Sequence, residues 1–187
     1  MTDPTSSAQT GADVWVELHG STAPMHAFVA GDDSFAAKLS RLEQRPRDER
    51  FVATWVSRPA MRHLLQLCER LGGLGVVRWR LRFMLEGEER LVPRLSMAAP
   101  RALQAAKAAQ RAGMHVELEG APLCVLGPFR SLLVHGARRS FTARCEGCEV
   151  RNECQGIAAG YAARFGGEDL RTQHLLAQRT GSISSQP

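Results

Sequence analysis

Strand-like segments alternate with helix-like segments along most of this chain, and the strand-like segments carry charge on one side. In residues 76–85 four apolar residues take turns with three arginines: Val77, Trp79, Leu81 and Phe83 with Arg78, Arg80 and Arg82. A period of two is typical of a β-strand whose two faces meet different surroundings. Because strands separated by helices connect by right-handed crossovers, this order predicts an α/β fold with a mainly parallel sheet.

The pattern predicts about four strands with helices between them. The strands are expected at residues 14–18, 51–56, 76–85 and 114–119, and the helices at residues 34–44, 61–71 and 100–112. Gly72 and Gly73 are expected to end the second helix.

The strands do not read as the continuous apolar runs of a sheet covered on both faces. One face is therefore expected to pack on the helices, while the other needs water, internal ion pairs or another polypeptide. The three arginines of residues 76–85 could bind an anion or an acidic partner. The alternative is that they pair with Glu17 and Glu117 across the polar face.

The composition sets limits on the class of protein. The chain has 187 residues and a net charge of +5. It has no apolar run of the roughly 18–20 residues that cross a bilayer, and it has no signal-peptide core. We therefore expect a cytoplasmic protein that does not bind a membrane. Nucleic acid is not an expected partner, because no basic run is interleaved with aromatic residues. Residues 1–11 and 179–187 are expected to be disordered tails.

Four of the five cysteines form a C-x20-C-x2-C-x5-C pattern, made of Cys124, Cys145, Cys148 and Cys154. In a reducing compartment such cysteines more often bind metal than form disulfides. Four thiolates suit an iron–sulfur cluster or zinc. Structural zinc sites commonly use two paired C-x2-C knuckles, whereas this chain has one C-x2-C pair and two single cysteines. This pattern fits the irregular ligation of a cluster better than that of zinc. Zinc binding and unligated thiols remain alternatives. His135 is an alternative ligand, and Cys68 is expected in the core.

The order of several short segments along the chain is informative. They are residues 18–22 (Leu-His-Gly-Ser-Thr) with His26, residues 31–35, residues 51–58, residues 75–83, residues 119–124, the closing Cys145-x2-Cys148-x5-Cys154-Gln-Gly156, and Tyr161 with Phe165-Gly166. From about Val14 to Leu170 this order resembles the C-terminal half of a radical S-adenosylmethionine enzyme followed by its auxiliary cluster region. The resemblance implies a partial, TIM-like half-barrel and a [4Fe–4S] cluster on the four cysteines.

Two departures separate the chain from that family. The C-x3-C-x2-C loop that holds the cluster which cleaves S-adenosylmethionine is absent, as are the strands that would precede Val14. Ala60 lies near the place where many members have an Asn that contacts the cofactor. Cleavage of S-adenosylmethionine by this chain alone is therefore not expected, and no catalytic residue is assigned.

Other polar residues have two interpretations each. His19 and His26 are expected in the loop at the carboxyl end of the first strand, where a ligand or acid–base role competes with a structural hydrogen bond. Four arginines near the cysteines could offset the negative charge of a cluster or lie on a solvated loop: Arg138, Arg139, Arg144 and Arg151.

The sequence thus predicts a partial α/β barrel at residues 12–120 and a cysteine-rich auxiliary cluster module at residues 121–178. The first hypothesis is an accessory or degenerate radical-SAM-like iron–sulfur protein that docks on a protein partner, a peptide or a second copy of itself through the open sheet face or edge. The second is one half of a split enzyme acting on a peptide or small molecule. The third is a zinc-stapled interaction domain.

Overall fold

The computed structural model describes residues 14–134, 136 and 139–171, and within them the chain forms one parallel sheet. Its strands are β1 (Val16–Glu17), β2 (Phe51–Val56), β3 (Arg78–Phe83), β4 (His115–Glu119) and β5 (Leu133–Val134). They lie in the order β1-β2-β3-β4-β5, and every neighbouring pair is parallel. The predicted α/β fold with a parallel sheet is confirmed, but the described residues contain five strands rather than about four.

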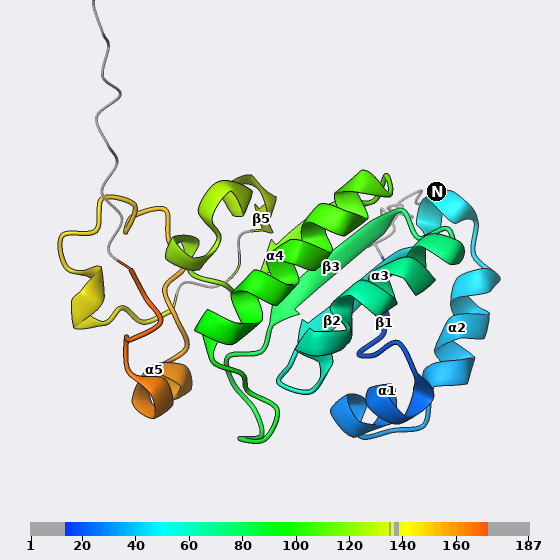
Figure 1. Cartoon of the computed structure of the whole chain (residues 1–187), viewed down its shortest axis with the longest axis horizontal. Helices are drawn as coiled ribbons and strands as arrows, with labels where there is room; N and C mark the ends of the chain where they lie inside the picture. The colour runs from blue at the N-terminus through cyan, green and yellow to red at the C-terminus, as the bar shows by residue number, and fades with distance from the viewer. Residues whose placement is uncertain (1–13, 135, 137–138, 172–187) are drawn as a thin grey trace, which may run out of the picture.

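Helices α1 to α4 lie in the connections between consecutive strands, and α5 follows β5. They are α1 (Ala23–Ala30), α2 (Phe35–Glu43), α3 (Leu64–Gly73), α4 (Leu95–Arg111) and α5 (Ala159–Phe165), with short 3-10 turns η1 (Arg47–Glu49), η2 (Ala60–His63), η3 (Leu123–Val125), η4 (Gly127–Leu132) and η5 (Ala143–Cys145). α3 and α4 cross the same side of the sheet (Figure 1). Consecutive strand order with right-handed crossovers places such helices on one face.

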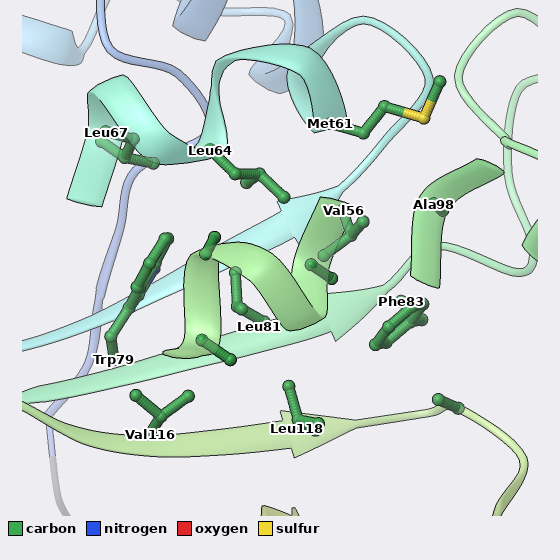
Figure 2. Packing of buried hydrophobic residues seen from close by; sticks show 14 of the residues in the cluster. Val56, Met61, Leu64, Leu67, Trp79, Leu81, Phe83, Ala98, Val116 and Leu118 are labelled. Atoms are coloured by element: carbon green, nitrogen blue, oxygen red, sulfur yellow. The ribbon is translucent and has the colours of Figure 1, made fainter. Parts of the chain in front are cut away.

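The core lies between that face and α3 and α4. Trp79, Leu81 and Phe83 of β3 are at most 2% exposed and point toward the helices (Figure 2). In register, their neighbours on β2 and β4 also face the helices: Val52, Thr54, Val56, Val116 and Leu118. The α4 residues in this core are mainly alanines, which lets the helix approach the strands closely. The predicted alternation therefore sets which face is buried.

Some element boundaries differ from the prediction. α4 begins at Leu95, five residues before the predicted start, and holds Pro100 inside the helix. Proline is common in the first turn of a helix, because it lacks the N–H that an interior position donates. α3 is preceded by η2 and continues through Gly73. α1 was not predicted, so His26 lies in a helix and not in a loop.

The described residues of 121–171, called the cysteine region below, have little regular structure besides β5 and α5, and they pack on the end of the sheet region, residues 14–120. Ile157, Tyr161 and Leu170 belong to the same buried core as the strands. The Tyr161 hydroxyl accepts a hydrogen bond from the Leu95 amide (2.6 Å) and donates one to Asp169 (2.5 Å). The start of α4 is thereby tied to α5 and to the segment that follows it.

Parts of the sequence prediction lie outside the described residues, namely the two tails and residues 172–178 of the predicted cysteine module. Within the described part of the chain, none of the helices combines the length and apolar character that crossing a bilayer requires.

Candidate functional site

The four cysteines of the pattern come from three turns and line one small cavity. Cys124 lies in η3, Cys145 ends η5, and Cys148 and Cys154 lie in the turns that follow. All four border a cavity of about 20 Å³ whose remaining walls are largely apolar. Cys68 is 4% exposed in the core of α3, as predicted, and is not among the lining residues. The structure thus brings together the four cysteines that the spacing singled out.

Two glycines shape the backbone that carries three of these cysteines. Gly147, between Cys145 and Cys148, has φ +69°, a left-handed conformation that favours glycine. Gly156 has φ +76°, and a Cβ there would clash with the carbonyl of Ser140. Ser140 forms an antiparallel bridge with Ile157. This bridge closes a loop that carries Cys145, Cys148 and Cys154.

Backbone amides surround one of the sulfurs. The amides of Leu123 and Gly156 each donate to Cys154 Sγ over 3.4 Å. N–H donors of this kind stabilise a thiolate and, in iron–sulfur proteins, help to set the reduction potential. Burial raises the pKa of the Cys124 thiol, and the nearby Cys154 and Cys145 raise it further. The thiolate form of Cys124 is therefore disfavoured unless a cation, such as a metal, lies beside it.

Arginines lie around the cysteine cavity, and the prediction identified two of them. Arg144 and Arg151 are lining residues, and Arg171 is a third that the sequence prediction did not single out. The Arg151 guanidinium lies 5.0 Å from the centre of the Phe141 ring. Arg139 is not among the lining residues. Arg138 and His135 lie outside the described residues.

The donor set fits a thiolate-bound group, whereas the present cavity does not fit a bulky one. Its volume of about 20 Å³ is that of roughly one water molecule. Among the described residues, no group of three or more His, Cys, Asp or Glu side chains is arranged so that it could hold a metal ion. A group larger than a water molecule would therefore enter only if the turns around the cavity moved apart.

The polar face of the sheet is held by internal ion pairs. Glu117, with its side chain 6% exposed, accepts from Arg78 and Arg80 at 2.6 Å each. Arg82 pairs with Glu17 and Glu119, both at 3.0 Å. Burial alone would raise the pKa of Glu117, but the hydrogen bonds from the two arginines outweigh it and lower that pKa. The alternative of internal pairing across the face is confirmed.

Aromatic rings complete this face. The Arg80 guanidinium lies 4.2 Å from the centre of the Trp15 ring, and that of Arg82 lies 5.1 Å from Trp55. Charge and stacking are thus satisfied within the face itself. The edge strands β1 and β5 have two residues each.

His19 and His26 form a buried, stacked pair at the carboxyl end of β1. Their ring centres are 5.4 Å apart with nearly parallel planes. His19 Nδ1 accepts from the Trp55 amide (3.3 Å), and His26 Nδ1 accepts from the His19 amide (3.1 Å). In the neutral rings the proton therefore lies on Nε2 of each. These bonds support the structural interpretation of both histidines.

The surroundings of the pair disfavour a positive charge on either ring. Burial, followed by the charges of His26 and Lys38, lowers the pKa of His19 to about 4. Burial and Lys38 also lower the pKa of His26, although Asp32 opposes them. Both rings are therefore neutral at pH 7.

Comparisons of the chain with models of known families, with curated proteins and with solved structures find no match. The family resemblance accordingly rests on the motifs of the sequence alone. What the geometry adds is the convergence of four cysteines at the end of a parallel sheet.

Proposed function

We propose that this protein is an accessory, degenerate relative of radical S-adenosylmethionine enzymes that binds one [4Fe–4S] cluster and docks on a protein or peptide partner. Cys124, Cys145, Cys148 and Cys154 are the proposed ligands. The observation that carries the proposal is that these four side chains, and not Cys68, line one cavity.

The spacing of the cysteines favours a cluster over zinc, because zinc sites commonly use two C-x2-C pairs and this chain has one pair and two single cysteines. Four cysteines on one zinc ion lie at about 2.3 Å from a common centre. In a cluster each thiolate binds a different iron, so the four sulfurs need to surround a larger object and not meet at one point. Such a cluster supplies one-electron chemistry or holds its protein segment in shape.

The sheet is consistent with the half-barrel that the resemblance implies. Its strands follow one another in sequence order, without the reversal that defines a doubly wound sheet. Helices α3 and α4 cover one face, as they would on the outside of a barrel (Figure 1). The arginines and glutamates described above lie on the opposite face, which corresponds to the barrel interior.

The split-enzyme alternative is favoured by one observation, the position of β1. In the described residues β1 pairs with β2 alone, so its other edge is open at the place where the preceding strands of a barrel would join. A second chain carrying C-x3-C-x2-C would supply both those strands and the missing cluster. Co-purification of the protein from its native source, with the bound chain identified by mass spectrometry, tests this alternative.

The cluster proposal is tested by anaerobic purification of the full chain followed by iron, sulfide and zinc analysis. We expect about four irons and four sulfides per chain and a broad absorption that fades on reduction with dithionite. Serine at any of the four proposed ligands should lower the iron content, whereas Cys68→Ala should not. An equimolar zinc content without sulfide would overturn the cluster, and so would equal iron loss from Cys68→Ala.

A further inference from the structure

A second hollow of the described surface is a groove that none of the four cysteines lines. It has a volume of about 660 Å³, within the usual range of ligand sites. Its lining comes from α1, the segments that follow β2 and β3, the start of α4, and α5. In Figure 1, α1 and α5 lie on either side of the loop that follows β3, so the lining residues are drawn from both sides of this loop.

The polar part of the lining is cationic. Four arginines and one histidine contribute to it, namely Arg58, Arg62, Arg90, Arg94 and His63, and no lining residue within the described chain is acidic. The rest is apolar, with Met25, Met61 and Met97 among it. Met97 is 50% exposed and Phe28 is 47% exposed, which is unusual for large apolar side chains. Methionines adapt their shape to varied ligands.

The arginines are spread along the groove and do not converge on one point. Arg90 lies 4.9 Å from the centre of the Phe28 ring at the α1 end, and Arg94 lies 5.2 Å from that of Phe165 at the α5 end. Between them, Arg58 donates to the carbonyl of Val92 at 3.0 Å, which positions the loop after β3. Cations spaced in this way suit a peptide with several carboxylates along its length better than they suit one compact anion.

Two of these arginines already hold carboxylates on the exposed rim. Arg90 binds Glu88 at 2.7 Å, and Arg94 binds Glu168 at 3.2 Å. Exposed pairs of this kind contribute little stability, so an incoming carboxylate can replace them at small cost. Arg62 is exposed and, within the described part of the chain, has no hydrogen bond or ion pair. It is the cation most available to a ligand.

We infer that this groove binds an acidic peptide segment of a partner protein, one in which carboxylates alternate with apolar side chains. The carboxylates bind the arginines, and the apolar side chains pack on the methionines and Phe28. The inference deepens the docking role proposed above by naming a surface and a partner chemistry. It does not need the iron–sulfur cluster, because none of the four proposed ligands lines the groove.

The test is fluorescence anisotropy of a labelled ten-residue peptide of alternating glutamate and leucine, with the full chain as the binder. We expect a Kd of about 10–100 μM that weakens with added salt. Serine–leucine and lysine–leucine peptides of the same length should bind at least about tenfold more weakly.

Arg62→Gln is the cleanest variant, because it breaks no side-chain hydrogen bond or ion pair within the described residues. It should weaken the glutamate–leucine peptide about three- to tenfold, and Arg94→Gln should do the same. Arg111→Gln, at the opposite end of α4, is the matched control and should leave the Kd unchanged. Circular dichroism melting of all three variants checks that each is folded.

Three outcomes would overturn the inference. They are equal binding of the serine–leucine peptide, loss of binding in Arg111→Gln as large as in Arg62→Gln, and tighter binding of a ten-nucleotide oligothymidine than of the acidic peptide. Metal analysis of the same sample separates the two proposals. If a cluster-loaded protein does not bind the acidic peptide, the groove proposal is wrong and the cluster proposal stands. If a metal-free sample binds the peptide, the groove proposal is supported and only the cluster proposal is contradicted.

Discussion

The sheet region and the cysteine region satisfy their polar groups in different ways. In the sheet region the arginines of β3 find carboxylates on β1 and β4, so the charged face is closed by the chain itself. In the cysteine region four sulfurs meet in turns with little regular structure, around a cavity no larger than a water molecule. The first region pairs its charges internally, whereas the second brings together four thiols for which we propose a bound metal cluster as the partner.

This difference predicts which region depends on metal. Binding free energy of a ligated metal is folding free energy for the segment that holds it. The sheet region instead depends on buried apolar area and internal ion pairs. Each prediction below separates these two sources of stability.

The largest effect is expected from metal removal. Treating the loaded protein with a chelator under anaerobic conditions should abolish amide protection across residues 139–157 and leave that of β2, β3 and β4 intact, because the strands hold none of the proposed ligands. Hydrogen exchange with mass spectrometry measures both regions in one sample. Equal loss of protection in the strands, or none in residues 139–157, would contradict the proposed division.

Acid should weaken the sheet region through His19. Its folded-state pKa of about 4 lies below the ordinary 6.5, so the unfolded chain takes up the proton first as the pH falls. Stability is therefore full above pH 6.5, falls by up to about 3 kcal/mol between pH 6.5 and 4, and does not change further through this group below pH 4.

Urea unfolding at several pH values, followed by tryptophan fluorescence, measures this dependence. His19→Asn keeps an acceptor for the Trp55 amide but does not titrate, so its stability should depend less on pH in that range. His63→Gln, in which a histidine of the η2 turn is changed, is the matched control and should behave as the wild type. Identical curves for His19→Asn and the wild type would contradict the assignment.

The polar face should respond to loss of its buried carboxylate. Glu117→Gln leaves Arg78 and Arg80 without their shared anion and should cost about 2–3 kcal/mol, the lower end for a buried pair since both arginines are partly exposed. Glu88→Gln, which removes an exposed pair, should change little. Urea unfolding measures both. A cost for Glu88→Gln as large as that for Glu117→Gln would contradict the role of burial.

The smallest effect is expected at the connection between the regions. Tyr161→Phe removes the hydroxyl that binds the Leu95 amide and Asp169, and should cost about 1–2 kcal/mol while iron content stays unchanged. Burial raises the pKa of Tyr161 well above its usual value, so the hydroxyl stays protonated throughout this experiment. Phe165→Leu is a control that alters the same helix without removing a hydrogen bond. A loss of iron in Tyr161→Phe would instead place this residue among those that hold the site.

The elements that the sequence predicted well are those whose pattern has a clear period. β2 lies at residues 51–56 as predicted, and β3 and β4 lie within their predicted ranges. In these strands alternation alone distinguishes the helix-facing side from the charged side. By contrast, α1 reads Ala-Pro-Met-His-Ala-Phe-Val-Ala, which is apolar almost all round and shows no helical stripe. β5 has two residues, too few for any period.

The cysteine site and the groove also differ in how far the sequence predicts them. The cysteines were identifiable because residue type and spacing carry the chemistry of metal ligation. The groove was not identifiable, because Phe28, Arg62, Arg94 and Phe165 are scattered along the chain and only the fold brings them to one edge. The stacking of His19 on His26 likewise depends on α1, which the sequence did not reveal.

The strand order has a consequence for any partner that joins at β1. The segment that carries Cys124 follows β4, which lies three strands away from β1. Neighbouring strands are about 4.8 Å apart, so the two places are separated by about 14 Å across the sheet. A cofactor supplied by a chain paired to β1 would thus lie beyond contact with the cysteines. One substrate atom could then not touch both that cofactor and the cysteines.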